Sequence, residues 1–405
     1  MKKGVKLFLI ILIILLLTAC SSSYKIIEVE KNTAPETGIV PSTTNITPDE
    51  PVANPEIQPL PETTLETKTT SFALKNTKYT TSGAYNGILY STIDNWKNAT
   101  INTNQAFSDM EDNGVNYALI QFAIIEAPTR ENLVKTKDLG FILSIIQEHP
   151  QRVNVIFNPA MNATDEKAIL STTLTDEFTK KLSTSRSIAQ NNIIKGFGEF
   201  PLNTWGLQAT NDRLTGIYNL ANANKLAISL HPLKGKVPLD DFTSLAKDYP
   251  QITFIVQDVT PIEFDDNYDS FISLLNKTNN VYYTIDSNAI LYDGAQSSIT
   301  KEDSIDTAKA VTNFNAEFDS NYQSYINDAV LRYKPLVNAY PNRVLWGSSL
   351  GNNYTYTPEV YNRIIKADRI FIGKMDADKQ EALAYKNALN LFGEGVVLQN
   401  EISIA

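Results

Sequence analysis

The strongest constraint on this fold is a series of short apolar runs separated by longer amphipathic segments, from about residue 85 onward. The runs are apolar on both faces, which is typical of strands covered on both sides of a parallel sheet. The eight units predict an α/β fold of the (β/α)8 TIM barrel type, and a doubly wound open sheet is the alternative. The expected strands are residues 87–93, 116–124, 152–158, 193–200, 225–231, 252–257, 281–286 and 343–349.

The segments between these runs have the periodicity of amphipathic helices, and several of them end in Gly or Pro. The clearest are residues 103–114, 137–150, 215–224 and 242–250. The gap between the seventh and eighth runs is the longest, and residues 303–337 within it predict one or two extra helices that cover the barrel mouth.

The N-terminus has the pattern of a targeting segment rather than of the fold. Lys2, Lys3 and Lys6 precede an apolar run that is short for a membrane span, although a plain transmembrane anchor is the alternative. Residues 17–20, "LTAC", contain the only cysteine of the chain. The segment resembles a bacterial lipoprotein signal peptide, residues 1–19, cut before Cys20. The resemblance implies a lipidated Cys20 that holds the protein on the extracytoplasmic face of the cell membrane.

Residues 20–84 are expected to form a disordered linker after the lipidated cysteine. Seven of the 18 prolines lie between Pro35 and Pro61, among Thr, Glu, Asn and Ser, and apolar residues are sparse. The barrel is expected to occupy residues 85–405. The formal net charge of −10 and the absence of a Lys/Arg cluster argue against nucleic acid as a partner.

In a barrel of this kind, functional side chains gather at the C-terminal ends of the strands. Polar residues at those ends need a partner or a function, because burying them unpaired is costly. Helix capping is the competing role, and we favour it for Asp94, Asn158 and Asp258. Glu199 and His231 follow neighbouring strands, which favours a functional role for them. The full set is Asp94, Gln121, Asn158, Glu199, His231, Gln257, Asp258, Asp286, Ser348 and Ser349.

The order of several phrases resembles the amidohydrolase superfamily, in its amidohydrolase-related branch of metal-dependent TIM-barrel hydrolases. The similar phrases are "IIKGFGEF" (193–200), "TGIYNLANANKLAISLHP" (215–232), "FTSLAKDYPQITFIVQD" (242–258), "NNVYYTIDS" (279–287), "PNRVLWGSSL" (341–350) and "YKNALNLFG" (385–393). The resemblance implies a hydrolase whose metal is held by a His-x-His pair at strand 1, histidines at strands 5 and 6, and an aspartate at strand 8.

Most of that ligand set is missing from this chain. His231 stands at strand 5, but strand 1 has no histidine, and Gln257 and Ser349 stand at the strand 6 and strand 8 positions. The second histidine, His149, is expected to be an exposed residue at a helix end. Because a catalytic zinc usually needs about three strong ligands, we expect no cofactor. The alternative is a single divalent metal on Glu199, His231 and Asp286.

Three functions compete at this point. The first is a degenerate amidohydrolase, a pseudoenzyme kept as a binding or interaction module, whose mouth holds a small polar ligand. Trp96 and Trp346 would add contacts there, although core packing is the stronger expectation for Trp346. The second is an active hydrolase of amides, esters or lactones, with His231 as general base and Glu199 or Asp286 as its partner. The third is a glycoside hydrolase that uses Glu199 and Asp286.

Overall fold

The computed structural model describes only part of the chain, and all of the described residues belong to the compact unit Ile57–Ala405. The predicted signal peptide, Cys20, nearly all of the linker, Trp96, Asn158 and Asp258 lie outside the described residues, so the expected domain boundaries remain predictions. The described residues are 82–95, 103–121, 139–157, 194–232, 234–257, 259–291, 306–350 and 353–395, with 175, 179, 182–183 and 299.

Eight parallel strands form one sheet in the order of the sequence, which confirms the barrel and excludes the doubly wound alternative. The first and last strands meet through side chains: Thr92 Oγ1 donates to the Trp346 carbonyl at 2.7 Å, and the Ser91 and Ser348 hydroxyls are 2.9 Å apart. The strands are β1 (Leu89–Asn95), β2 (Val115–Gln121), β3 (Val153–Phe157), β4 (Ile194–Phe200), β5 (Ala227–Leu230), β6 (Thr253–Val256), β7 (Val281–Asp286) and β8 (Val344–Gly347).

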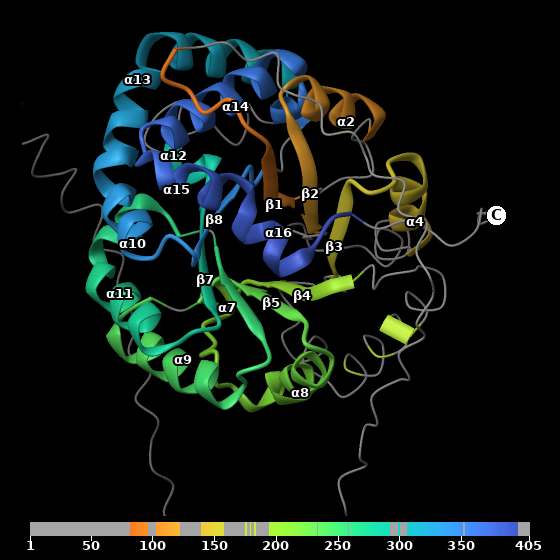
Figure 1. Ribbon diagram of the computed structural model, residues 1–405, viewed down its shortest axis with the longest axis vertical. Coiled ribbons are helices and arrows are strands. Elements are labelled where there is room, and N and C mark those ends of the chain that lie inside the picture. The colour runs from red at the N-terminus through yellow and green to blue at the C-terminus, as the bar shows by residue number, and fades with distance from the viewer. Residues whose placement is uncertain are drawn as a thin grey trace, which may run out of the picture. The chain divides into compact units, whose positions relative to one another are not determined.

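Helices surround the strands (Figure 1). The longer ones are α2 (Thr103–Asp112), α4 (Leu139–Glu148), α8 (Thr215–Asn224), α9 (Lys236–Asp248), α10 (Pro261–Asp266), α11 (Tyr268–Lys277), α13 (Thr307–Ala339) and α14 (Pro358–Gly373). The short ones are α7 (Leu202–Trp205), η1 (Asp212–Leu214), α12 (Ser287–Leu291), η4 (Asn353–Tyr356), α15 (Ala377–Glu381), η5 (Ala382–Lys386) and α16 (Asn387–Phe392).

The predicted insertion is a single helix, α13, capped at its start by the Asp306 side chain, which accepts from the Ala308 and Lys309 amides. It packs against α14. It also contacts α12, which follows β7, and η4, which follows β8. The extra helix is therefore confirmed, whereas coverage of the barrel mouth stays a prediction.

Alternation along each strand separates two apolar cores. Phe254 and Val256 of β6 pack outward with the helices, whereas Ile255 between them points into the barrel lumen. The same alternation on β2, β5 and β7 directs Gln121, His231 and Asp286 into the lumen at its C-terminal end. The fold thus brings these polar side chains to one end of the barrel.

The N-terminal end of the lumen is closed by α16. Phe392 packs into the lumen core with Tyr90 and Tyr117. The Asn154 amide nitrogen donates to the Tyr90 hydroxyl at 2.8 Å and to the carbonyls of Phe392, Gly393 and Glu394 at 3.2–3.3 Å. Because this end is filled, we expect ligands to enter from the opposite end.

A buried arginine on α14 joins the outer helix to the start of the sheet. Arg369 is fully buried, and its guanidinium donates to the carbonyls of Tyr85 (2.8 Å), Gly87 (3.0 Å) and Asn113 (2.6 and 3.2 Å). Those carbonyls lie just before β1 and β2, so one side chain fixes the entry of two strands.

His149 differs from the sequence expectation. It follows α4 as predicted, but it is half-buried, and its ring stacks on Phe107 at 3.8 Å between centroids. Burial lowers its pKa to about 4, with a smaller contribution from the charge of Arg152. The prediction of an exposed residue was wrong, because a helix end can still face a neighbouring helix.

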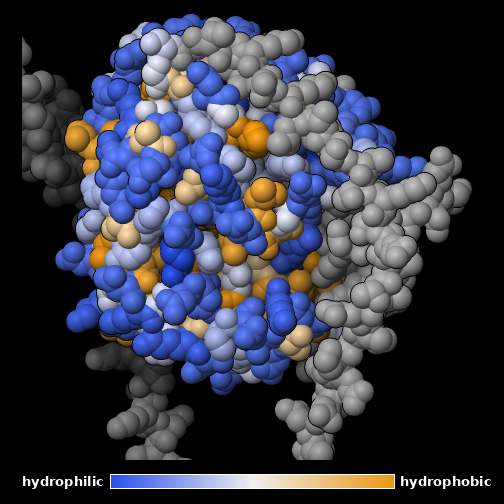
Figure 2. Space-filling view, in the orientation of Figure 1, coloured by the Kyte–Doolittle hydropathy of each residue, from blue (hydrophilic) through white to orange (hydrophobic). Residues whose placement is uncertain are grey.

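Polar residues predominate on the face of the molecule shown in Figure 2. The large apolar side chains exposed in the described residues are Val237, Ile262 and Leu331. None of the helices in the described part of the chain combines the length and the hydropathy needed to cross a bilayer.

Candidate functional site

Glu199 and His231 form a buried pair at the ends of neighbouring strands. His231 Nε2 contacts Glu199 Oε1, and the two residues are 7% and 6% exposed. The register between β4 and β5 shifts between Phe197 and Phe200, and a shift of this kind re-aims a side chain. The backbone is fixed as well, because His231 N donates to the Phe200 carbonyl at 2.9 Å. The predicted convergence of Glu199 and His231 is confirmed.

A pair of amides spans the lumen beside this contact. Gln121 Nε2 donates to Gln257 Oε1 at 2.9 Å, and Gln257 Nε2 donates to Gln121 Oε1 at 3.3 Å. Gln121 ends β2 and Gln257 follows β6, which stand on opposite walls of the barrel. We call this pair the crossbar. Gln257 was predicted as a site residue, whereas its partnership with Gln121 was not.

Asp286 ends β7 and caps the short helix α12. Its Oδ1 accepts from the Ala289 amide at 2.8 Å. The next two residues reach other elements: Ser287 Oγ donates to Asp368 Oδ2 at 2.6 Å, and Asn288 Nδ2 donates to the Ser349 carbonyl at 3.3 Å. Three successive side chains thus connect β7 to its own helix, to α14 and to the turn after β8.

Asp368 is a fully buried carboxyl behind this turn. Burial raises its pKa well above the ordinary value, and the negative charge of Asp286 raises it further. The Ser287 hydroxyl, the Trp346 indole and the charge of Arg369 act in the opposite direction. Asp368 lies on α14 rather than at a strand end, so the strand-end pattern of the sequence does not include it.

The two serines after β8 have structural partners. Ser348 N donates to Ser91 Oγ at 3.0 Å, which ties the end of β8 to β1. Ser349 has a left-handed backbone conformation, with φ of 46°, and is nearly buried.

Asp94 lies near the end of β1, with its Cα paired to that of Ile120. Trp346 belongs to the outer core and is fully buried, so the stronger expectation for it, core packing, is confirmed.

The side chains at this end do not fit a zinc centre. Within the described residues, no group of three His, Cys, Asp or Glu side chains is placed to hold an ion. His231 Nε2 is engaged by Glu199, and the neutral Gln257 amide is engaged by Gln121. Neutral amide and hydroxyl groups do not replace the nitrogen, sulfur and carboxylate ligands that zinc prefers.

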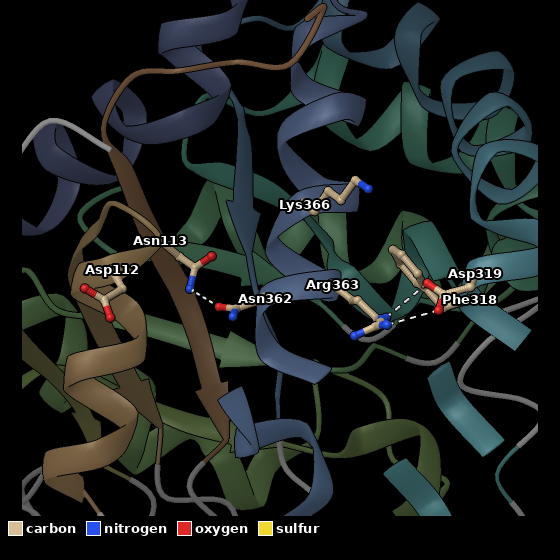
Figure 3. Close-up of a pocket in the computed structure, with 7 residues that line it drawn as sticks. All are labelled: Asp112, Asn113, Phe318, Asp319, Asn362, Arg363 and Lys366. Atoms are coloured by element: carbon tan, nitrogen blue, oxygen red, sulfur yellow. Dashed lines mark hydrogen bonds and ion pairs between the residues drawn. The ribbon is translucent and has the colours of Figure 1, made fainter. Parts of the chain in front are cut away.

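A cavity of about 510 Å³ lies on the outer surface between α2, α13 and α14. Figure 3 shows that Arg363 points toward Asp319, and its Nε and Nη2 donate to that carboxylate at 3.1 and 3.0 Å. Lys366 Nζ lies 4.9 Å from the centroid of the Tyr322 ring. Because Arg363, Asp319 and Lys366 already have partners, this cavity is a weaker candidate than the lumen.

Comparisons with known proteins concern the architecture. No protein-family model matches the sequence. No curated protein matches it. The structural neighbours are amidohydrolase-superfamily proteins, and at the identities found the likeness is one of fold. They include a zinc-bound amidohydrolase from Burkholderia multivorans (11% identity, 76% of this chain and 100% of that chain, TM-score 0.45), a dihydroorotase from Campylobacter jejuni (13%, 79% and 89%, 0.42) and a TatD homologue from Escherichia coli (13%, 76% and 97%, 0.44).

Proposed function

We propose, from a barrel whose structural neighbours are amidohydrolase-superfamily proteins, that this chain is a ligand-binding module without that superfamily's metal centre. The observation that carries the proposal is the buried contact of Glu199 with His231. One of the two imidazole nitrogens, Nε2, is bound to a carboxylate of the same chain. The mouth then offers paired polar groups, and such groups suit a small polar ligand that exchanges hydrogen bonds with them.

We further propose that Cys20 tethers the barrel to the outer face of the cell membrane. The support is the lysine-rich start, the apolar run and the small residues before a single cysteine. Replacement Cys20→Ala is expected to abolish both the attached lipid and the cut before residue 20, so that the variant keeps residues 1–19 and lacks the lipid mass, as measured by intact-mass spectrometry. A wild-type protein that keeps residues 1–19 and carries no lipid would show that the apolar run, rather than a lipid, is the anchor.

A second candidate function is metal-independent hydrolysis, and the same pair of residues favours it. A carboxylate at Nε2 favours the imidazole tautomer with its proton on that nitrogen, which makes Nδ1 the proton acceptor. His231 could then take a proton from water or from a substrate hydroxyl, with Glu199 stabilising the imidazolium. Amides, esters and lactones are the substrate classes to screen for this activity.

Metal content is the measurement that tests the proposed function. The full-length chain, purified without a histidine tag, is expected to carry far less than one equivalent of zinc, manganese, iron or nickel by mass spectrometry. The Glu199→Gln variant should give the same result, because a single imidazole without further strong ligands does not hold a metal ion. About one metal per chain in the wild type, lost in a His231→Ala variant, would contradict the proposal and favour a hydrolase.

A further inference from the structure

The crossbar divides the lumen at its C-terminal end with neutral groups only. Gln121 and Gln257 are at most 1% exposed, and each amide uses one donor and one acceptor in the reciprocal pair. Each amide therefore keeps one N–H and further acceptor capacity for another partner. An ion would need charged ligands at this depth, whereas amides suit an uncharged partner.

Two buried hydroxyls stand on β5 and β7, the strands that flank Gln257, with Thr284 at its level and Ser229 one inward-facing position deeper. Val256 pairs with Tyr283, so Gln257 and Thr284 are the next residues in register on neighbouring strands. Ser229 of β5 pairs with Ile255, two residues before Gln257. The residues on either side of Thr284 and of Ser229 belong to the outer core, which directs both hydroxyls into the lumen.

Neither hydroxyl has a hydrogen-bond partner within the described residues, although Thr284 is 3% exposed and Ser229 is fully buried. Buried polar groups are almost always hydrogen-bonded, because leaving one unpaired is costly. Two such hydroxyls on strands that flank Gln257 indicate a position that another polar group fills. Hydroxyls and amides both donate and accept, so they can match either a donor or an acceptor, and the cost of burying a charge among neutral groups favours an uncharged one.

We infer that Thr284, Ser229 and the Gln257 amide form a deep subsite for an uncharged hydroxyl group, filled by water in the free protein and by a ligand hydroxyl in the complex. The inference rests on the proposed ligand-binding function and adds a ligand class to it, namely neutral alcohols and polyols. The resemblance implied a metal ion in the lumen, whereas this inference places an uncharged hydroxyl group there.

The first test uses the sign of a stability change. In the full-length chain, Thr284→Val removes the hydroxyl and keeps the shape, and Thr284→Ser keeps the hydroxyl. If the subsite holds water, Thr284→Val should lower the midpoint of thermal unfolding by several degrees, because the water loses a partner. In a dry lumen the same change would raise the midpoint, since an unpartnered hydroxyl becomes a methyl group. A raised midpoint in Thr284→Val would overturn the inference.

The second test uses glycerol as the probe. Glycerol stabilises most proteins by exclusion from their surface, which gives a linear, unsaturable slope that all variants share. Binding at the subsite should add a saturable component in the wild type and in Thr284→Ser, with about tenfold weaker affinity in Thr284→Val. Equal saturable components in the wild type and Thr284→Val, or none in any of the three proteins, would overturn the inference.

Crystals of the full-length chain soaked in a manganese salt separate this inference from the proposed function. The expected result is solvent density within hydrogen-bonding distance of Thr284 Oγ1 without an anomalous signal. An anomalous peak beside Thr284 would overturn the inference, and one between Glu199 and His231 would overturn the proposed function. Hydroxyls of Thr284 and Ser229 that both turn to backbone carbonyls in a dry lumen would overturn the inference alone.

Discussion

His231→Ala is expected to lower the free energy of unfolding by about 3–5 kcal/mol, the range found when a buried charge loses its partner. The change leaves the Glu199 carboxylate buried at 6% exposure without its imidazole partner. It also creates a cavity next to the crossbar, which adds to the loss. Urea unfolding of the full-length chain, followed by circular dichroism, measures the change.

The matched controls separate the charge from the cavity. The double variant Glu199→Gln with His231→Ala removes the buried carboxylate while the cavity remains, so it should recover a large part of the lost stability. Glu199→Gln alone keeps a hydrogen-bond acceptor for Nε2 and should cost much less than His231→Ala. Equal stability of the single His231→Ala variant and the wild type would show that the pair is not formed in solution.

Arg369→Ala is the second change with a large expected effect, a loss of about 4 kcal/mol or more. The guanidinium donates to three carbonyls, two of them in buried contacts, and a hydrogen bond to a charged group contributes about 1.5–3 kcal/mol. The carbonyls of Tyr85, Gly87 and Asn113 all lose that donor together. Hydrogen exchange should show the largest gain in amide exposure at the starts of β1 and β2, and urea unfolding gives the total loss.

Arg369→Lys is the control for this prediction. Lysine keeps the positive charge but not the planar fork that reaches carbonyls from two strand entries at once. We therefore expect it to recover part, but not all, of the stability. If Arg369→Lys matched the wild type, charge rather than geometry would account for the role of Arg369.

The fold could be predicted from the sequence because both-face apolar runs report burial directly. Residues 281–286 were expected as a strand and form β7 with the same bounds. Helix boundaries were less accurate: the helix expected from residue 242 begins at Lys236, with Pro238 in its first turn, where proline is tolerated. The helix was predicted from its apolar periodicity. The start of a helix depends instead on capping and first-turn residues, which that periodicity does not show.

The site could be predicted only in part. Glu199 and His231 follow adjacent strands, so their convergence follows from strand order alone. The crossbar joins residues 136 positions apart on opposite walls, and it depends on the width of the closed barrel, which no local pattern reports. Thr284 and Ser229 read as ordinary strand residues, and only alternation along β7 and β5 shows that they point inward.

The closure of the N-terminal end of the lumen by α16 and residues 393–394, which we call the floor, has a consequence for the order in which the chain folds. Its contacts are highly non-local, since Asn154 reaches Glu394 across 240 residues and Tyr90 reaches Gly393 across 303. The floor segment follows all eight strands, so a growing chain cannot seal the lumen until the last strand has been made. Contacts of such high order slow folding and leave apolar strands exposed meanwhile. Folding of the barrel therefore belongs to the time after synthesis of β8, and chaperones that hold the nascent chain would act before that point.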